Sequence, residues 1–357
     1  MFFYFGPLCP LPLCLIFRAG NICWLPASLC PLWLNLIREW GGRFPVSLPK
    51  IFAEQGFRYR KRWGQNFLVD ENIVRKIIAA ARLSPADTVV EIGAGAGALT
   101  RALAQNAGLV VTVEIDARLR PVLAETLKGL DNVELIFADA LAQDFDALVK
   151  AKAARRGGLP AAVPPYKVVA NIPYSITAPL LSHLLQGNFH FSFLLLMVQL
   201  EVARRLVAGP GDADYGAFSV FVQFYTESEI LFRVPRTVFY PRPEVDSAVV
   251  RLEKRAQPAV AVPDEGHFFD LVRAAFGQRR KTILNALAGC PAAAAEDPRG
   301  RVRRLDRDAW REILRAAGID PGRRGEALSL EEFAALARQS WRQAPAIPDQ
   351  LRKEVIT

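Results

Sequence analysis

Residues 88–97, TVVEIGAGAG, constrain the fold of this chain more than any other segment. Thr88 to Ile92 is a short run, rich in β-branched residues, that is typical of a buried parallel strand. It leads directly into a turn with three glycines in five positions, and then into a helical pattern. A strand, a glycine turn and a helix form the first unit of a doubly wound nucleotide-binding sheet. We therefore predict an α/β fold with a Rossmann-like, mostly parallel sheet.

Acidic residues in the first three predicted strands indicate an adenosine pocket. The glycine spacing is GxGxG rather than the GxGxxG of dinucleotide sites, and Glu91 precedes it. The next strand, over 110–116, carries Glu114, where a carboxylate can accept from both ribose hydroxyls. The third strand, over 133–140, carries Asp139, which is placed to accept from an adenine amino group. Each acid alone could equally cap a helix, but together they favour S-adenosylmethionine over NAD.

Two amides lie upstream of the first strand. Gln65 and Asn66 belong to the sequence WGQNFL, which precedes a predicted helix over 71–82. Their side chains could close over the methionine end of such a cofactor, or could cap the helix.

The motif Asn171-Ile172-Pro173-Tyr174 follows a fourth predicted strand, over 166–170. An exocyclic adenine nitrogen is a poor nucleophile because its lone pair is delocalised into the ring. Two acceptors that hold the amino hydrogens would favour a more tetrahedral nitrogen, and the Asn171 side chain and the Ile172 carbonyl can supply them. Pro173 fixes the turn, and Tyr174 offers a face to a base removed from its stack. The alternative is a strand exit with a helix cap and a core aromatic.

A second aromatic candidate comes from the sequence VFYPRPEVDSAVVRL. Its prolines rigidify a loop before a strand with alternating apolar residues. We prefer Phe239 as the opposite face of a base sandwich, mainly because of the resemblance described below. Tyr240 is its rival, and a loop aromatic that covers the core is the alternative.

The basic residues indicate a polyanionic partner. The formal net charge is +9, from 45 basic and 36 acidic residues, although charge alone fits a merely soluble surface equally well. The segment from 58 to 63 also interleaves aromatic residues, and the segment 278–281 is predicted on a helix. Solvated surfaces are the alternative for both. We expect two clusters to bind phosphates: Arg58, Arg60, Lys61 and Arg62 in the first, and Arg279, Arg280 and Lys281 in the second.

The first 45 residues differ from the rest in composition. Residues 1–37 are apolar, with Arg18 as their one charge, and contain five prolines. The run is too short and too interrupted for a membrane helix, and it lacks the basic start and cleavage site of a signal peptide. We predict that this piece is upstream sequence included by a wrong start assignment, and that the protein begins near Val46.

Cysteine and histidine usage suits a reducing cytoplasm and no metal. Four of the five cysteines fall in the first thirty residues, so the body has no disulfide framework. The three histidines show no metal-binding spacing. We expect a cytoplasmic protein without a metal site and without a membrane contact.

The C-terminal part is predicted to be a separate helical domain. A Pro/Ala-rich linker near residue 256 precedes helical patterns, and Ser329 with Glu332 forms a capping box. We divide the chain into an extension (1–45), a Rossmann-like domain with a basic arm (46–255), a helical domain (256–340) and a flexible tail (341–357).

Taken in order, these motifs resemble the bacterial ribosomal small-subunit RNA adenine N6,N6-dimethyltransferases. GQNFLVD, EIGAGAGALT, VEID, ADAL, NIPYSITAPLL, FYPRPEVDSAVVRL and AFGQRRKTILNAL recur in sequence over about residues 47–340. The resemblance implies an S-adenosylmethionine-dependent methyltransferase domain with a seven-stranded sheet and a small all-helical C-terminal domain. It also implies a target-base motif at 171–174 with Phe239 as its partner. The implied cofactor residues are Gln65, Asn66, Leu68, Gly93, Gly95, Glu114, Asp139, Ala140 and Asn171.

The same resemblance implies a substrate. We expect a monomer that dimethylates two adjacent adenosines near the 3′ end of the small-subunit (16S) rRNA in immature 30S particles. The nearest alternative is the large-subunit rRNA dimethyltransferase of the macrolide-resistance type, which shares the cofactor and target-base motifs. A non-catalytic rRNA-binding assembly factor is the alternative from another class.

Overall fold

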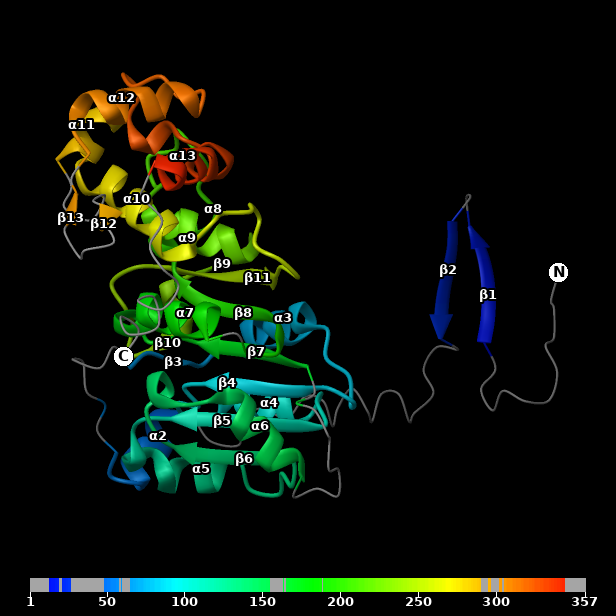
Figure 1. Ribbon diagram of the computed structural model, residues 1–357. Helices are drawn as coiled ribbons and strands as arrows, with labels where there is room; N and C mark the ends of the chain where they lie inside the picture. The colour runs from blue at the N-terminus through cyan, green and yellow to red at the C-terminus, as the bar shows by residue number, and fades with distance from the viewer. Residues whose placement is uncertain are drawn as a thin grey trace. The chain divides into compact units, whose positions relative to one another are not determined.

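The computed structural model is shown in Figure 1. It describes residues 13–18, 21–26, 48–57, 59, 65–154, 163, 165–187, 189–289, 295–296, 302–303 and 305–343. The predictions for Arg58, Arg60, Lys61, Arg62, most of 1–45 and the tail after 343 therefore lie outside the described residues. No helix in the described ranges combines the length and apolarity needed to cross a bilayer.

The chain divides into two units, residues 1–53 and 54–357. In the first unit, β1 (Leu13–Arg18) and β2 (Asn21–Pro26) form an antiparallel pair. The helix α2 (Leu48–Glu54) ends at the boundary between the units.

The second unit is built on a seven-stranded sheet with the order β6-β5-β4-β7-β8-β11-β9. The first five strands in this order run parallel, and β11 is antiparallel to both of its neighbours. This arrangement confirms the predicted Rossmann-like, mostly parallel sheet. The strands are β4 (Thr88–Ile92), β5 (Leu109–Glu114), β6 (Val133–Phe137), β7 (Tyr166–Asn171), β8 (Phe191–Gln199), β9 (Thr226–Val234) and β11 (Ser247–Lys254).

Helices cover both faces of the sheet (Figure 1). Successive residues of β4 point to opposite faces, so Val89 and Val90 belong to two different apolar clusters and neither is exposed. Burial on both faces explains why these strands read as continuous apolar runs. The helices are α3 (Glu71–Ala81), α4 (Ala98–Ala104), α5 (Arg120–Thr126), α6 (Phe145–Ala154), α7 (Thr177–Gln186), α8 (Leu200–Val207) and α9 (Ala217–Tyr225).

A separate two-stranded sheet joins distant parts of the chain. β3 (Phe67–Leu68) pairs antiparallel with β10 (Phe239–Tyr240), so Phe67 lies opposite Tyr240 and Leu68 opposite Phe239. The pairing places the segment after the basic arm beside the loop that leads into β11.

The C-terminal helices form their own apolar core. They are α10 (Glu265–Gly277), α11 (Ile283–Ala288), α12 (Arg307–Ala316) and α13 (Leu330–Gln343). Val220 and Phe224 of α9 pack into this core, whereas Val222 of the same helix packs into a sheet cluster. One helix from before the predicted boundary therefore serves both cores, and the boundary at 255/256 stays a prediction.

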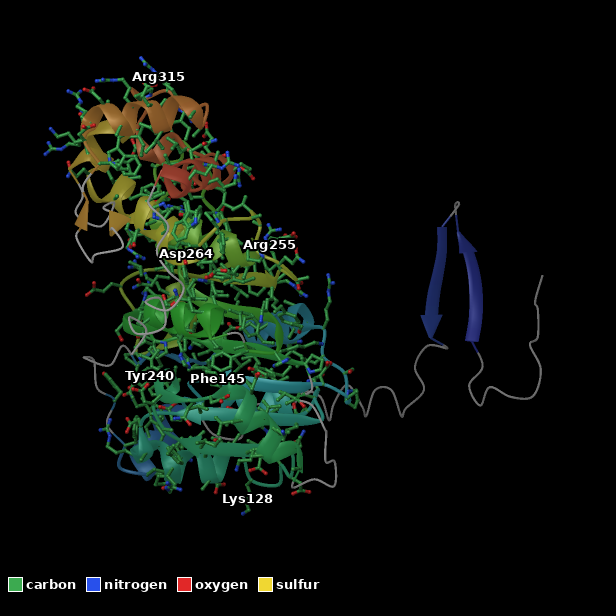
Figure 2. All side chains as sticks on the ribbon, viewed as in Figure 1. Lys128, Phe145, Tyr240, Arg255, Asp264 and Arg315 are labelled. Carbon is green, nitrogen blue, oxygen red and sulfur yellow. The ribbon has the colours of Figure 1, made fainter. Side chains whose placement is uncertain are left out.

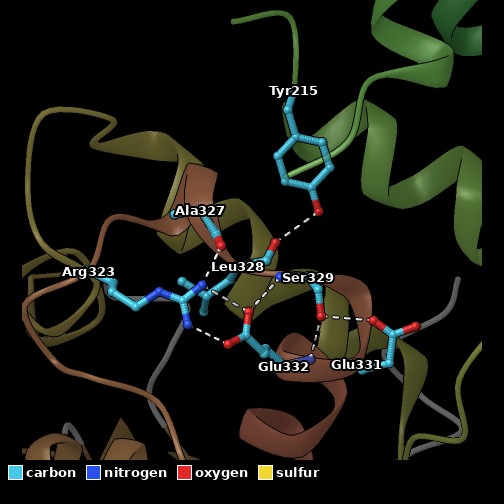
Figure 3. A network of polar contacts seen from close by, with 7 residues as sticks. All are labelled: Tyr215, Arg323, Ala327, Leu328, Ser329, Glu331 and Glu332. Atoms are coloured by element: carbon cyan, nitrogen blue, oxygen red, sulfur yellow. Dashed lines mark hydrogen bonds and ion pairs between the residues drawn. The ribbon is translucent and has the colours of Figure 1, made fainter. Parts of the chain in front are cut away.

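Figure 3 shows the polar contacts that start α13. The Ser329 N–H donates to Glu332 Oε2 (2.8 Å), and the Glu332 N–H donates to Ser329 Oγ (3.2 Å). These two bonds confirm the predicted capping box. Arg323 forms an ion pair with Glu332, and the buried Tyr215 hydroxyl donates to the Leu328 carbonyl at 3.0 Å. The loop before α9 is thereby fastened to the helical part.

The prediction that 278–281 lies on a helix is wrong. α10 ends at Gly277, residues 278–281 form a turn, and α11 begins at Ile283. The Ile283 N–H donates to the Arg323 carbonyl at 2.7 Å, and Thr282 Oγ1 caps the new helix by accepting from the Asn285 N–H. A tertiary contact and a cap thus overrule the continuous helical pattern.

Candidate active site

A cavity of about 280 Å³ opens at the carboxyl ends of β4, β5, β6 and β7. Parallel sheets of this class bind ligands at this edge. All nine residues predicted to bind the cofactor line the cavity, together with Ile172, Pro173 and Tyr174 of the target-base motif. The structure therefore brings these predicted residues together, and their contact with a cofactor stays a prediction.

The glycine turn forms one wall of the cavity. Gly93 and Gly95 have φ angles of +86° and +55°, a region that L-residues with side chains rarely adopt. A Cβ atom at Gly95 would lie 3.3 Å from the Phe67 ring. The turn can thus lie close to a ligand only without side chains at these positions.

Glu114 is held in place at the end of β5. Its Oε2 accepts from the Gly95 N–H and its Oε1 from the Asp116 N–H, both at 2.9 Å. The side chain is nearly buried, and burial raises the pKa of its carboxyl group. A carboxylate has about four acceptor sites, so the group remains able to accept from a ribose.

Glu91 has a different position from the one that we expected. It is completely buried and does not line the cavity. The hydroxyls of Thr100 and Thr112 donate to its Oε2 at 2.6 and 2.7 Å, so it links β4 to α4 and β5. Its Oε1 has no partner among the described residues, and burial raises the pKa of the group to about 7.

Asp139 caps a short helix and also lines the cavity. Its Oδ1 accepts from the Leu141 N–H at 2.9 Å, at the start of a 3-10 turn over Ala140–Ala142. The side chain is exposed. The capping alternative is therefore correct, and the cap holds Asp139 at the cavity wall.

Gln65 and Asn66 connect two strand ends across the cavity. Gln65 Nε2 donates to Asp116 Oδ2 at 2.8 Å, just after β5. The Asn66 carbonyl accepts from Asn171 Nδ2 at 3.2 Å, at the end of β7. The alternative that they cap the next helix is wrong, because Asp70 caps α3 by accepting from two backbone N–H groups.

Hydrogen bonds to three other segments of the chain hold the target-base motif in place. Because Asn171 Nδ2 donates to Asn66, its Oδ1 is left as an acceptor with no partner among the described residues. The Ile172 N–H donates to the Met197 carbonyl of β8 at 3.2 Å. The Tyr174 hydroxyl forms a hydrogen bond with Ser247 Oγ at 2.9 Å, and burial raises the pKa of this phenol. These contacts hold the motif in place, and its role in orienting an amino group stays a prediction.

Phe239 and Tyr240 differ in exposure. Phe239 is 4% exposed and packs in the sheet cluster with Leu68, and it does not line the cavity. Tyr240 is 37% exposed. The stacking role of Phe239 stays a prediction, and it requires that an approaching base uncovers part of this ring.

The second basic cluster separates into two kinds of residue. Arg279 donates to the Ala213 and Tyr215 carbonyls at 3.1 and 3.3 Å and pairs with Glu326 at 3.3 Å. Arg280 and Lys281 are exposed and form no ion pair in the part of the chain that the structure describes. Arg279 thus has a structural role, whereas the other two have charges available for a partner.

Several lining residues were not predicted from the sequence, among them Phe67, Leu141 and Ile115. Ile115 lies between Glu114 and Asp116, lines the cavity and is 58% exposed. A large apolar side chain between two acids at a strand end was the available signal. The Ile115 side chain gives this part of the cavity an exposed apolar surface.

Comparisons with known proteins agree with this geometry. The family model described as ribosomal RNA adenine dimethylase matches residues 56–304. The ribosomal RNA small subunit methyltransferase A of Pelotomaculum thermopropionicum is 55% identical over 296 residues, which are 82% of this chain and 95% of that protein. The protein of the same name from Moorella thermoacetica is 55% identical over 81% of this chain and 94% of its own.

Solved structures show the same fold. A dimethyladenosine transferase from Plasmodium falciparum has a TM-score of 0.64 and 25% identity, covering 78% of this chain and 98% of its own. The 23S rRNA methyltransferase ErmE has a TM-score of 0.55 and 29% identity, covering 77% of this chain and 99% of its own.

Proposed function

The chain belongs to the ribosomal RNA adenine dimethylase family and is an rRNA adenine dimethyltransferase, and we propose that it modifies small-subunit RNA with S-adenosylmethionine. Its targets are the N6 amino groups of two adjacent adenosines near the 3′ end of the 16S rRNA. The names of the relatives with 55% identity favour the small subunit over the large-subunit type, to which ErmE belongs.

The observation that carries this proposal is the shared cavity of the cofactor residues and the target-base motif. Its parts match the parts of S-adenosylmethionine. Glu114 suits the ribose hydroxyls, Asp139 the adenine amino group and Ile115 the purine face, while the glycine turn admits a close ligand. When bound, S-adenosylmethionine would supply an electrophilic methyl group for transfer.

The residues of the motif orient the target amino group. Asn171 Oδ1 and the Ile172 carbonyl accept its two hydrogens, which favours a tetrahedral nitrogen with its lone pair directed away from the ring. Tyr174 stacks on the base, and Phe239 is the proposed second face. The Asn66 and Ser247 contacts fix these groups before the substrate arrives. Positioning of this kind contributes most of the catalysis that we propose.

The proposal also covers the setting of the reaction. The enzyme acts as a cytoplasmic monomer on immature 30S particles, and Arg280 and Lys281 contribute to phosphate binding. Both side chains are exposed, which supports this role.

Methylation by the full-length protein tests the proposal. With radiolabelled S-adenosylmethionine, immature small subunits should yield dimethyladenosine, and protein-free large-subunit RNA should not. Asn171→Ala should abolish transfer and leave RNA affinity nearly unchanged. Asn106→Ala, at a half-buried asparagine that bonds only within α4 and its end, is the matched control and should retain activity. Transfer only to large-subunit RNA, or full activity of Asn171→Ala, would contradict the proposal.

A further inference from the structure

The end of β10 and the loop that follows it present two side chains that the proposed reaction does not use. Tyr240 is 37% exposed, and Arg242 is exposed two positions later. Arg242 forms neither an ion pair nor a hydrogen bond with any residue that the structure describes. Pro241 and Pro243 restrict the backbone on either side of it.

Other residues hold this loop in place. Asp246 Oδ1 accepts from the Arg236 N–H and its Oδ2 from Arg233 Nε, both at 2.9 Å. Arg236 Nη1 donates to the Glu244 carbonyl at 2.7 Å. The Leu200 N–H donates to the Asp246 carbonyl at 2.9 Å. The far end of the loop is therefore anchored by the contacts of Arg233, Arg236 and Asp246.

The loop borders the target-base motif. Tyr240 lies opposite Phe67 in the small sheet, and Phe67 lines the cavity. At the other end of the loop, Ser247 bonds to the Tyr174 hydroxyl. Figure 2 shows Tyr240 at the edge of the sheet toward which β4, β5 and β7 run. A base on Tyr174 would therefore have the loop beside it.

The two side chains have complementary chemistry for a nucleotide. The Tyr240 ring makes an edge-to-face contact with the Tyr59 ring at a centroid distance of 6.0 Å, which orients it. Single-stranded RNA is bound by aromatic rings that stack on bases and by guanidinium groups that contact phosphates. In an RNA with two adjacent adenosines, the nucleotide nearest to the target is its neighbour in the chain.

We propose that Tyr240 and Arg242 form a second nucleotide site, in which Tyr240 stacks on the base that adjoins the target adenosine and Arg242 binds the phosphate between them. The site rests on the proposed function, because it needs an RNA substrate. It holds one adenosine while the other is methylated, and so it selects adjacent pairs.

The test pairs each enzyme variant with a matching change in the RNA. On an RNA with the natural neighbour, Tyr240→Ala should lower kcat/KM by about 5- to 150-fold, the range of base–aromatic stacking. When the neighbouring nucleotide has no base, kcat/KM of the wild-type enzyme should fall by a similar factor. On this abasic RNA, Tyr240→Ala should lower kcat/KM no further. Tyr240→Phe should retain activity on both. Arg242→Ala is tested in the same way, with an RNA in which an uncharged methylphosphonate replaces the phosphate between the two adenosines.

Controls separate this site from the rest of the reaction. S-adenosylmethionine affinity, measured by calorimetry, should be unchanged in all variants, and Lys128→Ala, exposed at the end of α5, should behave as wild type. An equal loss by Tyr240→Ala on the natural and the abasic RNA would overturn the second site while leaving the proposed function intact. No methyl transfer by the wild-type protein to any RNA would instead refute the proposed function.

Discussion

Replacement of Glu91 by glutamine should remove a pH dependence from the stability of the fold. Glu91 is fully buried, and Thr100 and Thr112 donate to one of its oxygens. Burial is the main reason that its pKa is raised to about 7, and the nearby Glu114 adds to the shift. The folded chain therefore keeps this proton at pH values at which the unfolded chain has lost it.

The size of the effect follows from the two pKa values. An unfolded glutamate titrates near 4.5, and the folded group near 7. Between these values the free energy of unfolding should fall by about 1.4 kcal/mol per pH unit, or by about 3 kcal/mol in total. The stabilisation that comes from the Glu91 proton is complete below pH 4.5 and is lost once the pH passes 7. Glutamine keeps an oxygen for Thr100 and Thr112 but does not titrate.

Urea unfolding at pH 5, 6, 7 and 8 measures this difference. The free energy of unfolding of Glu91→Gln minus that of the wild type should rise by about 2.5 kcal/mol between pH 5 and pH 8. Glu114 titrates in both proteins, so the difference reports mainly on Glu91. Glu125→Gln, at an exposed position of α5, is the control for loss of a surface carboxylate. Parallel curves for Glu91→Gln and the wild type would refute this assignment of the buried proton.

Four further predictions concern other parts of the fold and the site. Arg279→Ala should lower the free energy of unfolding by about 1 kcal/mol, because a half-exposed guanidinium loses two carbonyl partners. The double variant Arg280→Ala/Lys281→Ala should be as stable as the wild type, but it should bind RNA more weakly and with a smaller salt dependence. A loss of stability in the double variant and a loss of RNA binding in Arg279→Ala would contradict the structural role of Arg279 and the binding role of the other two. Gly97→Ala should cost about 3 kcal/mol in denaturant unfolding, since its φ is +86° and its Cβ would lie 2.6 Å from a threonine hydroxyl of α5; a smaller loss than 1 kcal/mol would show that the turn adapts. Asn171→Asp should slow transfer and shift the product toward monomethyladenosine in nucleoside mass spectrometry, because a carboxylate holds the last amino hydrogen more strongly; an unchanged dimethyl yield would refute this.

Local patterns predicted the strands and the cavity because parallel strands place their carboxyl ends at one edge. Gly93, Glu114 and Asp139 therefore meet in the structure as expected. The orientation of a side chain within a strand end depends on which neighbours pack against it, and for this reason the inward position of Glu91 was not predictable. The break between α10 and α11 depends on the carbonyl of Arg323, which is far away in sequence. Helical periodicity contains no information about such a partner.

The amide at position 171 has two functions that only an amide can combine. Its Nδ2 donates to the Asn66 carbonyl, across 105 positions of sequence, and its Oδ1 is left as an acceptor with no partner among the described residues. A carboxylate would place an oxygen against that carbonyl with no hydrogen between them, so it would lose the contact that orients it. Because Gln65 bonds to Asp116 just after β5, the same short segment also joins the part of the cavity proposed for the cofactor to the part proposed for the target base. The two motifs GQNF and NIPY therefore act as one structural unit, and a change in either should disturb methyl transfer through the geometry of the other.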